Sequence, residues 1–187
     1  MNETLLYAFR AITDIAAMLL LIRFLLQWVG ADFYNPVSQG ILKICSPIIR
    51  PLEKIIPSFG RFNLSVLVAA LLIKWSFFVV MAMAKGVLWA GIFAFIALAG
   101  FELLRTLVEI YFWGIFILVV FSWVGTPPHP AAGLVHQVIS PYMEPFRRLI
   151  PPLGMIDLSP MAAIFSLMFI RAKILPLIGM QITPFLM

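Results

Sequence analysis

Residues 64–84 read LSVLVAALLIKWSFFVVMAMA, an apolar block with a single charge, Lys74. A helix of this length rises about 30 Å, the thickness of the hydrocarbon core of a bilayer. Three further apolar blocks lie at residues 5–29, 103–124 and 160–182. Of the 187 residues 63% are hydrophobic and 11% are charged, against about a quarter charged in soluble domains. The sequence therefore predicts an all-α integral membrane protein with several spans.

An internal repeat organises these blocks. A shift of 94 positions superimposes Ser46-Pro47 on Ser140-Pro141 and Leu64-Ser65 on Leu158-Ser159. The prolines and glycines that recur are Pro36, Pro47, Pro51, Pro57 and Gly60, matched by Pro130, Pro141, Pro145, Pro151 and Gly154. We therefore expect two tandem copies of a span, a proline-kinked interfacial amphipathic segment and a second span. The copies are residues 1–84 (interfacial segment 36–60) and 102–187 (interfacial segment 130–154), and 85–101 is expected to be a short apolar linker helix between them.

Both proline-rich segments have the spacing of an amphipathic helix. In the first, Ile41, Ile44, Cys45 and Ile48 recur at helical intervals, which is typical of a helix lying in the membrane interface when basic residues fill the opposite faces. The basic residues expected to contact anionic lipid headgroups are Lys43, Arg50, Lys54, Arg147 and Arg148. A plain connecting loop is the alternative interpretation.

Prolines inside these segments predict breaks in the helices. A proline in a helix interior removes a hydrogen bond and costs about 3 kcal/mol. Ser46 and Ser140 suit N-cap positions, with Pro47 and Pro141 as the first helical residues. We therefore expect two short helices in each segment.

Several charged residues fall inside the apolar blocks. Arg10 and Asp14 are four residues apart and share one helical face, and Arg105 and Glu109 repeat that arrangement. The residues expected to form an intramembrane polar core are Arg10, Asp14, Lys74, Arg105, Glu109 and Arg171. Because charge inside a membrane is costly, such residues either line an ion or proton path or neutralise one another and fix the packing of the spans. Both interpretations stay open at this point.

No motif for catalysis, cofactor binding or metal binding is evident. Cys45 is the only cysteine, which excludes an intramolecular disulfide and a thiolate metal site. His129 and His136, seven residues apart in one segment, cannot approach one haem iron from opposite sides. We expect a protein that is not an enzyme and needs no cofactor or metal.

The partners that the composition favours are membrane lipids. The formal charge of +5 comes from basic residues at the edges of apolar blocks, where they would contact anionic lipid and not nucleic acid. A second copy of the chain, or another membrane protein, remains open as a further partner. Because the basic residues of short loops stay cytoplasmic, both proline-rich stretches should lie on that side. This gives four full spans, with residues 87–101 folding back without crossing.

The motifs Asn35-Pro36, Ser46-Pro47 and Ile56-Pro57, followed by Gly60, resemble those of the YggT family of bacterial inner-membrane proteins. The second copy repeats them, except that Glu144 stands where the first copy has Arg50. The resemblance covers nearly the whole chain. It implies a small multipass protein of the bacterial inner membrane, in a family without an established biochemical activity. No catalytic or binding residue can be transferred from it.

The resemblance to the YggT family also implies possible functions. Bacterial members are associated with osmotic stress and ion homeostasis or with the division site, and plastid relatives with cytochrome maturation. We expect a non-enzymatic protein that supports osmotic or ion homeostasis. The alternative is a membrane scaffold or assembly factor that recruits partners.

Overall fold

The computed structural model describes residues 3–86, 94–125, 129–150 and 157–182. Its helices are α1 (Glu3–Val29), α2 (Pro36–Glu53), α3 (Leu64–Lys85), α4 (Ala94–Val124), α5 (Pro130–Leu149), α6 (Ser159–Phe169), the π-helix η1 (Ile170–Ile174) and α7 (Leu175–Ile182). Helices α6, η1 and α7 follow one another without a break. Four helical stretches are long and apolar enough to cross a membrane: Glu3–Val29, Leu64–Lys85, Ala94–Ser122 and Ser159–Ile182. The chain is thus a helical protein with four candidate spans, as predicted.

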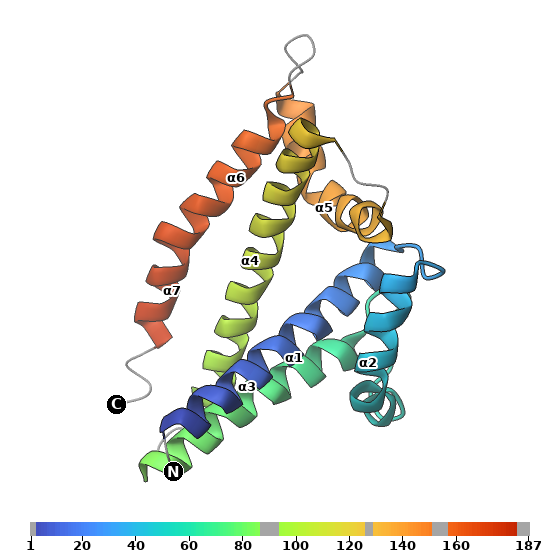
Figure 1. The fold of residues 1–187 in the computed structure, drawn as a ribbon. Helices are drawn as coiled ribbons and strands as arrows, with labels where there is room; N and C mark the ends of the chain where they lie inside the picture. The colour runs from blue at the N-terminus through green and yellow to red at the C-terminus, as the bar shows by residue number, and fades with distance from the viewer. Residues whose placement is uncertain (1–2, 87–93, 126–128, 151–156, 183–187) are drawn as a thin grey trace.

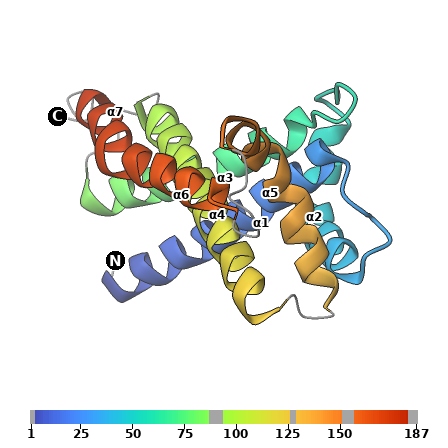
Figure 2. The same cartoon turned by 90° about the horizontal axis from the view of Figure 1, so that it is seen from above.

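The spans are splayed, and the two proline-rich helices cover one end of them (Figure 1). α1 packs along α3, α3 against α4, and α4 against α6 and α7. α2 and α5 contact each other and lie side by side when seen from above (Figure 2). The start of α1, the end of α3 and the end of α7 lie at the opposite end of the molecule. Both proline-rich helices are therefore on the same side of the spans.

The third span is longer than the sequence suggested. The short separate helix predicted over 85–101 is not formed by its described residues, because Lys85 ends α3 and Ala94 begins α4. Gly86 closes α3 in the left-handed conformation, with φ of +72°. Ala94 to Phe101 form the first turns of α4, and the helix continues without a break through Glu102 into the span that follows. Residues 87–93 lie outside the described part of the chain.

Each proline-rich segment is one continuous helix, not the predicted pair. α2 contains Pro47 and Pro51, and both are exposed, so the carbonyl groups that they leave without a donor are not trapped in the core. Ser46 is not an N-cap; its hydroxyl donates back to the Leu42 carbonyl, four residues earlier in the same helix. The N-cap of α2 is Asn35, whose side chain accepts from the Val37 backbone N–H at 2.9 Å.

α5 has the same construction with different capping chemistry. His129 caps the helix, because its Nδ1 accepts from the Ala131 backbone N–H at 3.1 Å. Pro141 and Pro145 lie inside α5, and the predicted N-cap Ser140 contacts His136 Nδ1 at 3.2 Å instead. The second helix is therefore also unbroken.

The loop after each proline-rich helix was predicted to recur. Pro57 and Gly60 lie between α2 and α3, and Gly60 has φ of +61°. The predicted counterparts, Pro151 and Gly154, lie outside the described residues. Ser65 and Ser159, at the starts of α3 and α6, are fully buried. Their hydroxyl groups donate to the Ile56 and Ile150 carbonyls at 2.9 and 3.4 Å, and so tie each proline-rich segment to the span that follows it.

The core lies where α1 and α4 meet α2 and α5. Leu20 of α1 and Ile115 of α4 are fully buried there, together with Ile49 of α2 and Ile139 of α5. Gly114 allows α5 to approach α4 closely, because a Cβ atom at this position would lie 2.4 Å from Ile139 Cδ1. The proline-rich helices α2 and α5 are thus packed onto the spans and are not loosely attached.

Candidate functional site

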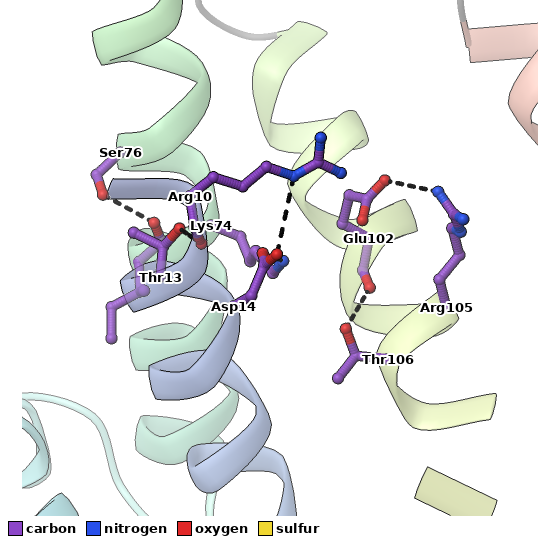
Figure 3. A network of polar contacts seen from close by, with 9 residues as sticks. Arg10, Thr13, Asp14, Lys74, Ser76, Glu102, Arg105 and Thr106 are labelled. Atoms are coloured by element: carbon purple, nitrogen blue, oxygen red, sulfur yellow. Dashed lines mark hydrogen bonds and ion pairs between the residues drawn. The ribbon is translucent and has the colours of Figure 1, made fainter. Parts of the chain in front are cut away.

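A group of charged residues joins α1 to α3 near the middle of both spans. Lys74 of α3 donates to Asp14 of α1, and its side chain is only 5% exposed. Arg10, one turn before Asp14, forms a second and longer ion pair with it at 3.8 Å. Figure 3 shows both cations directed at the one carboxylate. The structure therefore brings together all three residues that the sequence proposed for the first half.

The second half of the chain contains a corresponding pair. Arg171 of η1 binds Glu109 of α4 at 3.0 Å, and its guanidinium lies 4.7 Å from the centre of the Phe112 ring. Arg105 does not pair with Glu109, contrary to the expectation; it binds Glu102, one turn earlier, at 3.1 Å. Glu109 is therefore available to neutralise a cation from another span.

Glu102 was not among the predicted residues, although its spacing could have revealed it. Positions three residues before and four residues after Arg105 lie on the same side of a helix, so Glu102 and Glu109 were equally placed to pair with it. Figure 3 shows the Glu102–Arg105 pair of α4 beside the Arg10–Asp14–Lys74 group.

The cation of the last span sits in a local π-helix. η1 covers Ile170–Ile174 and includes Arg171 and Lys173, both exposed. A π-helical segment rotates the residues that follow it relative to an α-helix, and such segments are frequent at functional sites. The wider turn coincides with the residue that reaches across to Glu109.

Two cavities adjoin the charged residues. The α1–α4 cavity, of about 250 Å³, is lined by Asp14, Ile15, Met18, Lys74, Glu102, Arg105, Thr106 and Glu109. The η1 cavity, of about 350 Å³, is lined by Phe101, Arg105, Glu109, Arg171, Leu175, Pro176 and Gly179. Arg105 and Glu109 belong to both linings, so one guanidinium and one carboxylate connect the two halves of the charged network.

A third cavity, of about 320 Å³ and almost wholly apolar, lies between α1, α4 and the two proline-rich helices, α2 and α5. Val37 and Ile41 of α2 and Val135 of α5 contribute to its wall, and Glu109 lines it as well. Glu109 is therefore the one residue common to the three cavities named here.

A second ionic group, in which the arginine is buried and the acid is exposed, fixes the end of α1 to α2 and α3. The Arg23 side chain is 9% exposed and its Nη2 lies 3.4 Å from Glu53 Oε1, which also accepts from Asn63 Nδ2 at 3.0 Å. The sequence does not reveal this group, because Glu53 is 30 residues from Arg23 and no local spacing links them. Its position at the junction of three helices indicates a role in packing.

The apolar stripe predicted along α2 is divided between two surroundings. Cys45 and Ile49 face the core, whereas Ile44 is 61% exposed and Ile48 is also exposed. Burial raises the pKa of the Cys45 thiol, and the nearby Arg23 guanidinium offsets this only in part. The exposed isoleucines are free to contact the acyl boundary of a membrane.

All five basic residues predicted at the lipid interface are exposed. In α5, Arg148 binds Glu144 at 3.0 Å, and Arg147 binds Asp157 at 3.7 Å. Within the described part of the chain, the three that form no ion pair are Lys43, Arg50 and Lys54. α2 and its C-cap therefore present more uncompensated positive charge than α5.

The described residues contain no cluster of three or more His, Cys, Asp or Glu side chains that could hold a metal ion.

A comparison with known protein families shows to which family the chain belongs. The CCB3/YggT family matches residues 2–84 and 97–178. The chain belongs to the CCB3/YggT family. Each matched range includes a span, a proline-rich helix and a second span. Together the two ranges include every residue of the charged network.

Bacterial members of the CCB3/YggT family are close in length and sequence. The uncharacterised protein PA0392 of Pseudomonas aeruginosa is 36% identical over 172 residues, which cover 91% of this chain and 87% of the relative. The uncharacterised protein YggT of Escherichia coli K12 is 34% identical over 186 residues, covering 97% of this chain and 96% of the relative. No solved structure matches the chain.

Proposed function

We propose that this CCB3/YggT member is a non-enzymatic protein of the bacterial inner membrane that supports osmotic or ion homeostasis. The observation that carries the proposal is the pair of charged cavities sharing Arg105 and Glu109. Both cavities lie among the four spans, where charged side chains cost more free energy than apolar ones.

The volumes and the lining support an interaction with water and ions. At about 30 Å³ for each molecule of liquid water, the α1–α4 cavity of about 250 Å³ has room for roughly eight. Its lining holds three carboxylates and two cations. A purely structural ion pair would need no such space, because direct contact between the partners neutralises both.

The division of roles follows from the contacts. Asp14 holds Lys74 in place, and Glu109 holds Arg171. Arg105 and Glu109 are the groups exposed to both cavities, so the occupancy of one cavity is coupled electrostatically to the other. Replacing Glu109 should therefore disturb the function more than it disturbs the fold.

Complementation tests this proposal in a bacterium whose own CCB3/YggT protein has been deleted. Wild-type chain should restore growth after a rise in osmolarity, and Glu109→Gln should not, although it accumulates in the membrane. Lys173→Gln is the matched control, because Lys173 lies in the same π-helix as Arg171 but lines neither charged cavity. Full rescue by Glu109→Gln would show that the function does not depend on the charged network.

A scaffold that recruits other membrane proteins is the second candidate. Its support is the outward surface of the interfacial helices, where Leu149 of α5 and Ile55 after α2 are exposed beside basic residues. A scaffold should lose function when Arg147 and Arg148 are replaced by glutamine and should tolerate Glu109→Gln. The same complementation assay therefore separates the two functions.

We also propose that the two halves descend from one duplicated unit and that α2 and α5 face the cytoplasm. Both helices carry their basic residues in short connections between spans, which the positive-inside rule assigns to that side. Their basic side chains would then meet the anionic lipids of the inner leaflet.

A further inference from the structure

We propose that the η1 cavity binds a small inorganic anion, of the size and charge of chloride, between the guanidinium groups of Arg105 and Arg171. This inference rests on the proposed function, because it names the class of ion that the same site would take. It assigns a ligand to one cavity in particular, and the reasons are charge, hydrogen-bond donors and depth.

The charge of the network is unbalanced toward the positive. It has four cations and three carboxylates: Arg10, Lys74, Arg105 and Arg171 against Asp14, Glu102 and Glu109. Asp14 alone is shared by two of the cations. Neither Arg10 nor Lys74 lines the η1 cavity, so the choice of cavity rests on the charges of its own lining.

The lining of the η1 cavity carries a surplus of positive charge, and the lining of the α1–α4 cavity does not. The η1 cavity is lined by two cations and one carboxylate, whereas the α1–α4 cavity is lined by two cations and three carboxylates. Glu102, the partner of Arg105, faces only the α1–α4 cavity. An anion is therefore attracted to the η1 cavity and repelled from the other.

Both guanidinium groups have donors to spare. A guanidinium carries five N–H donors, and the ion pair of Arg171 is made through Nη2 and that of Arg105 through Nη1. The Phe112 ring holds the Arg171 guanidinium by one face, 4.7 Å from the ring centre, which leaves the donors at its edge free to point elsewhere. Two such edges lining one cavity form a site for a single acceptor ion.

Depth identifies the source of the anion. Arg171 lies in the middle of the span Ser159–Ile182, so roughly 16 Å of helix separates it from either end. A lipid phosphate at the membrane surface cannot reach that depth, whereas a small ion can do so through a hydrated cavity. With a volume of about 350 Å³, the η1 cavity is large enough for a chloride ion with several waters of about 30 Å³ each.

Thermal unfolding of the purified full-length protein in a non-ionic detergent tests the proposal. Sodium chloride is titrated against sodium gluconate at constant ionic strength, so that only the identity of the anion changes. Wild type should show a saturable rise in Tm with chloride. Arg171→Gln should weaken the apparent chloride affinity roughly tenfold or more, because one charged hydrogen bond is lost.

Two further variants keep the test decisive if Arg171→Gln does not fold. Arg105→Gln should weaken chloride binding likewise, and it leaves the Arg171–Glu109 pair in place. Lys173→Gln removes a neighbouring positive charge that does not line the cavity, and it should bind chloride as wild type does.

The outcomes separate this inference from the proposed function. No chloride effect in wild type, or an equal loss in Lys173→Gln, would overturn the anion site. A shift in Tm produced by phosphatidylglycerol in the micelle, but not by chloride, would overturn it in favour of a lipid. If Glu109→Gln restores growth as wild type does, the proposed role of the network in osmotic homeostasis is wrong. The chloride titration still decides by itself whether the anion site exists.

Discussion

The two halves of the chain agree in their packing and differ in their charges. Cys45 and Ile139, related by the offset of 94 residues, are both buried beneath the spans. Ser65 and Ser159, related by the same offset, donate to equivalent carbonyl groups. Packing contacts at positions 94 residues apart thus have similar surroundings in the two halves.

The charges are arranged differently. The position that corresponds to Lys74 is Met168, and the cation of the second half is Arg171, one turn further along and inside η1. Arg10 pairs with Asp14, whereas Arg105 turns away from Glu109 to Glu102. The packing of both halves thus depends on small and apolar residues, and the same packing accommodates different pairings of charge.

The strongest test of the likeness between the two halves is the side of the membrane on which each places its proline-rich helix. Because α2 and α5 contact each other, single cysteines at Ser58 and Leu149 should be labelled by an impermeant maleimide from the same side, the cytoplasm. Lys85→Cys, at the opposite end of α3, should be labelled only from the other side. All three belong in a Cys45→Ala background, and labelling of Ser58 and Leu149 from opposite sides would contradict the arrangement.

The next effect compares the two acids that bridge spans. Asp14→Asn should destabilise the protein by about 3 kcal/mol, because it leaves Lys74 buried without its partner. Glu109→Gln should cost about 1 kcal/mol, because Arg171 is 38% exposed and keeps its contact with Phe112. SDS-titrated unfolding in detergent micelles measures both.

A matched double variant controls that experiment. Asp14→Leu combined with Lys74→Met removes both charges, and it should recover most of the stability lost in Asp14→Asn. Equal losses for Asp14→Asn and Glu109→Gln would show that the two halves bury their charges equally.

A third experiment asks whether Cys45 and Ile139 occupy the same kind of position. Both side chains are buried, so Cys45 and a cysteine at Ile139 should react with an uncharged maleimide about tenfold more slowly than a cysteine at Ile44. Because burial raises the pKa of Cys45, its thiolate fraction is low at neutral pH, and the rate should keep rising as the pH increases above the usual thiol range. A rapid, pH-independent reaction of Cys45 would contradict its burial.

The smallest effect separates the two interfacial helices as lipid binders. A peptide of residues 36–57 carries one more net positive charge than a peptide of residues 130–151, because it has three basic residues against two and each peptide has one acid, Glu53 or Glu144. It should bind vesicles containing phosphatidylglycerol about fivefold more tightly, at about 1 kcal/mol for each added basic residue. Vesicle co-sedimentation measures the difference, which should shrink as salt is raised; equal binding at low salt would leave no role for the extra charge.

The sequence predicted the spans well because the bilayer sets their length. The block expected at 5–29 is α1 from Glu3 to Val29, and that at 64–84 is α3 from Leu64 to Lys85. The length rule could not place the start of α4, since an apolar linker and an apolar span have the same composition. The start of α4 depends on where its helix becomes continuous, and this depends on how the helix packs against α3.

The candidate site was predictable in its membership but not in its pairing. Charges inside apolar blocks are visible in any sequence, which is how Asp14, Lys74 and Arg171 were found. Which acid each base contacts depends on how the helices rotate about their axes, and that is set by distant contacts such as Gly114 against Ile139. The Arg23–Glu53 pair was missed for the same reason.

The order of acid and base along the chain has a consequence for biosynthesis. In each half the carboxylate comes first, Asp14 in α1 and Glu109 in α4, and its cation follows in a later span, Lys74 or Arg171. A lysine or arginine at the centre of a helix costs about 3 kcal/mol to insert by itself. Each cationic helix therefore leaves the translocon when its counterion is already in the bilayer. If the ribosome pauses between α1 and α3, Asp14 is already in the bilayer with Arg10, its neighbour in α1, as its counterion, and it is in place to pair with Lys74 when α3 is inserted.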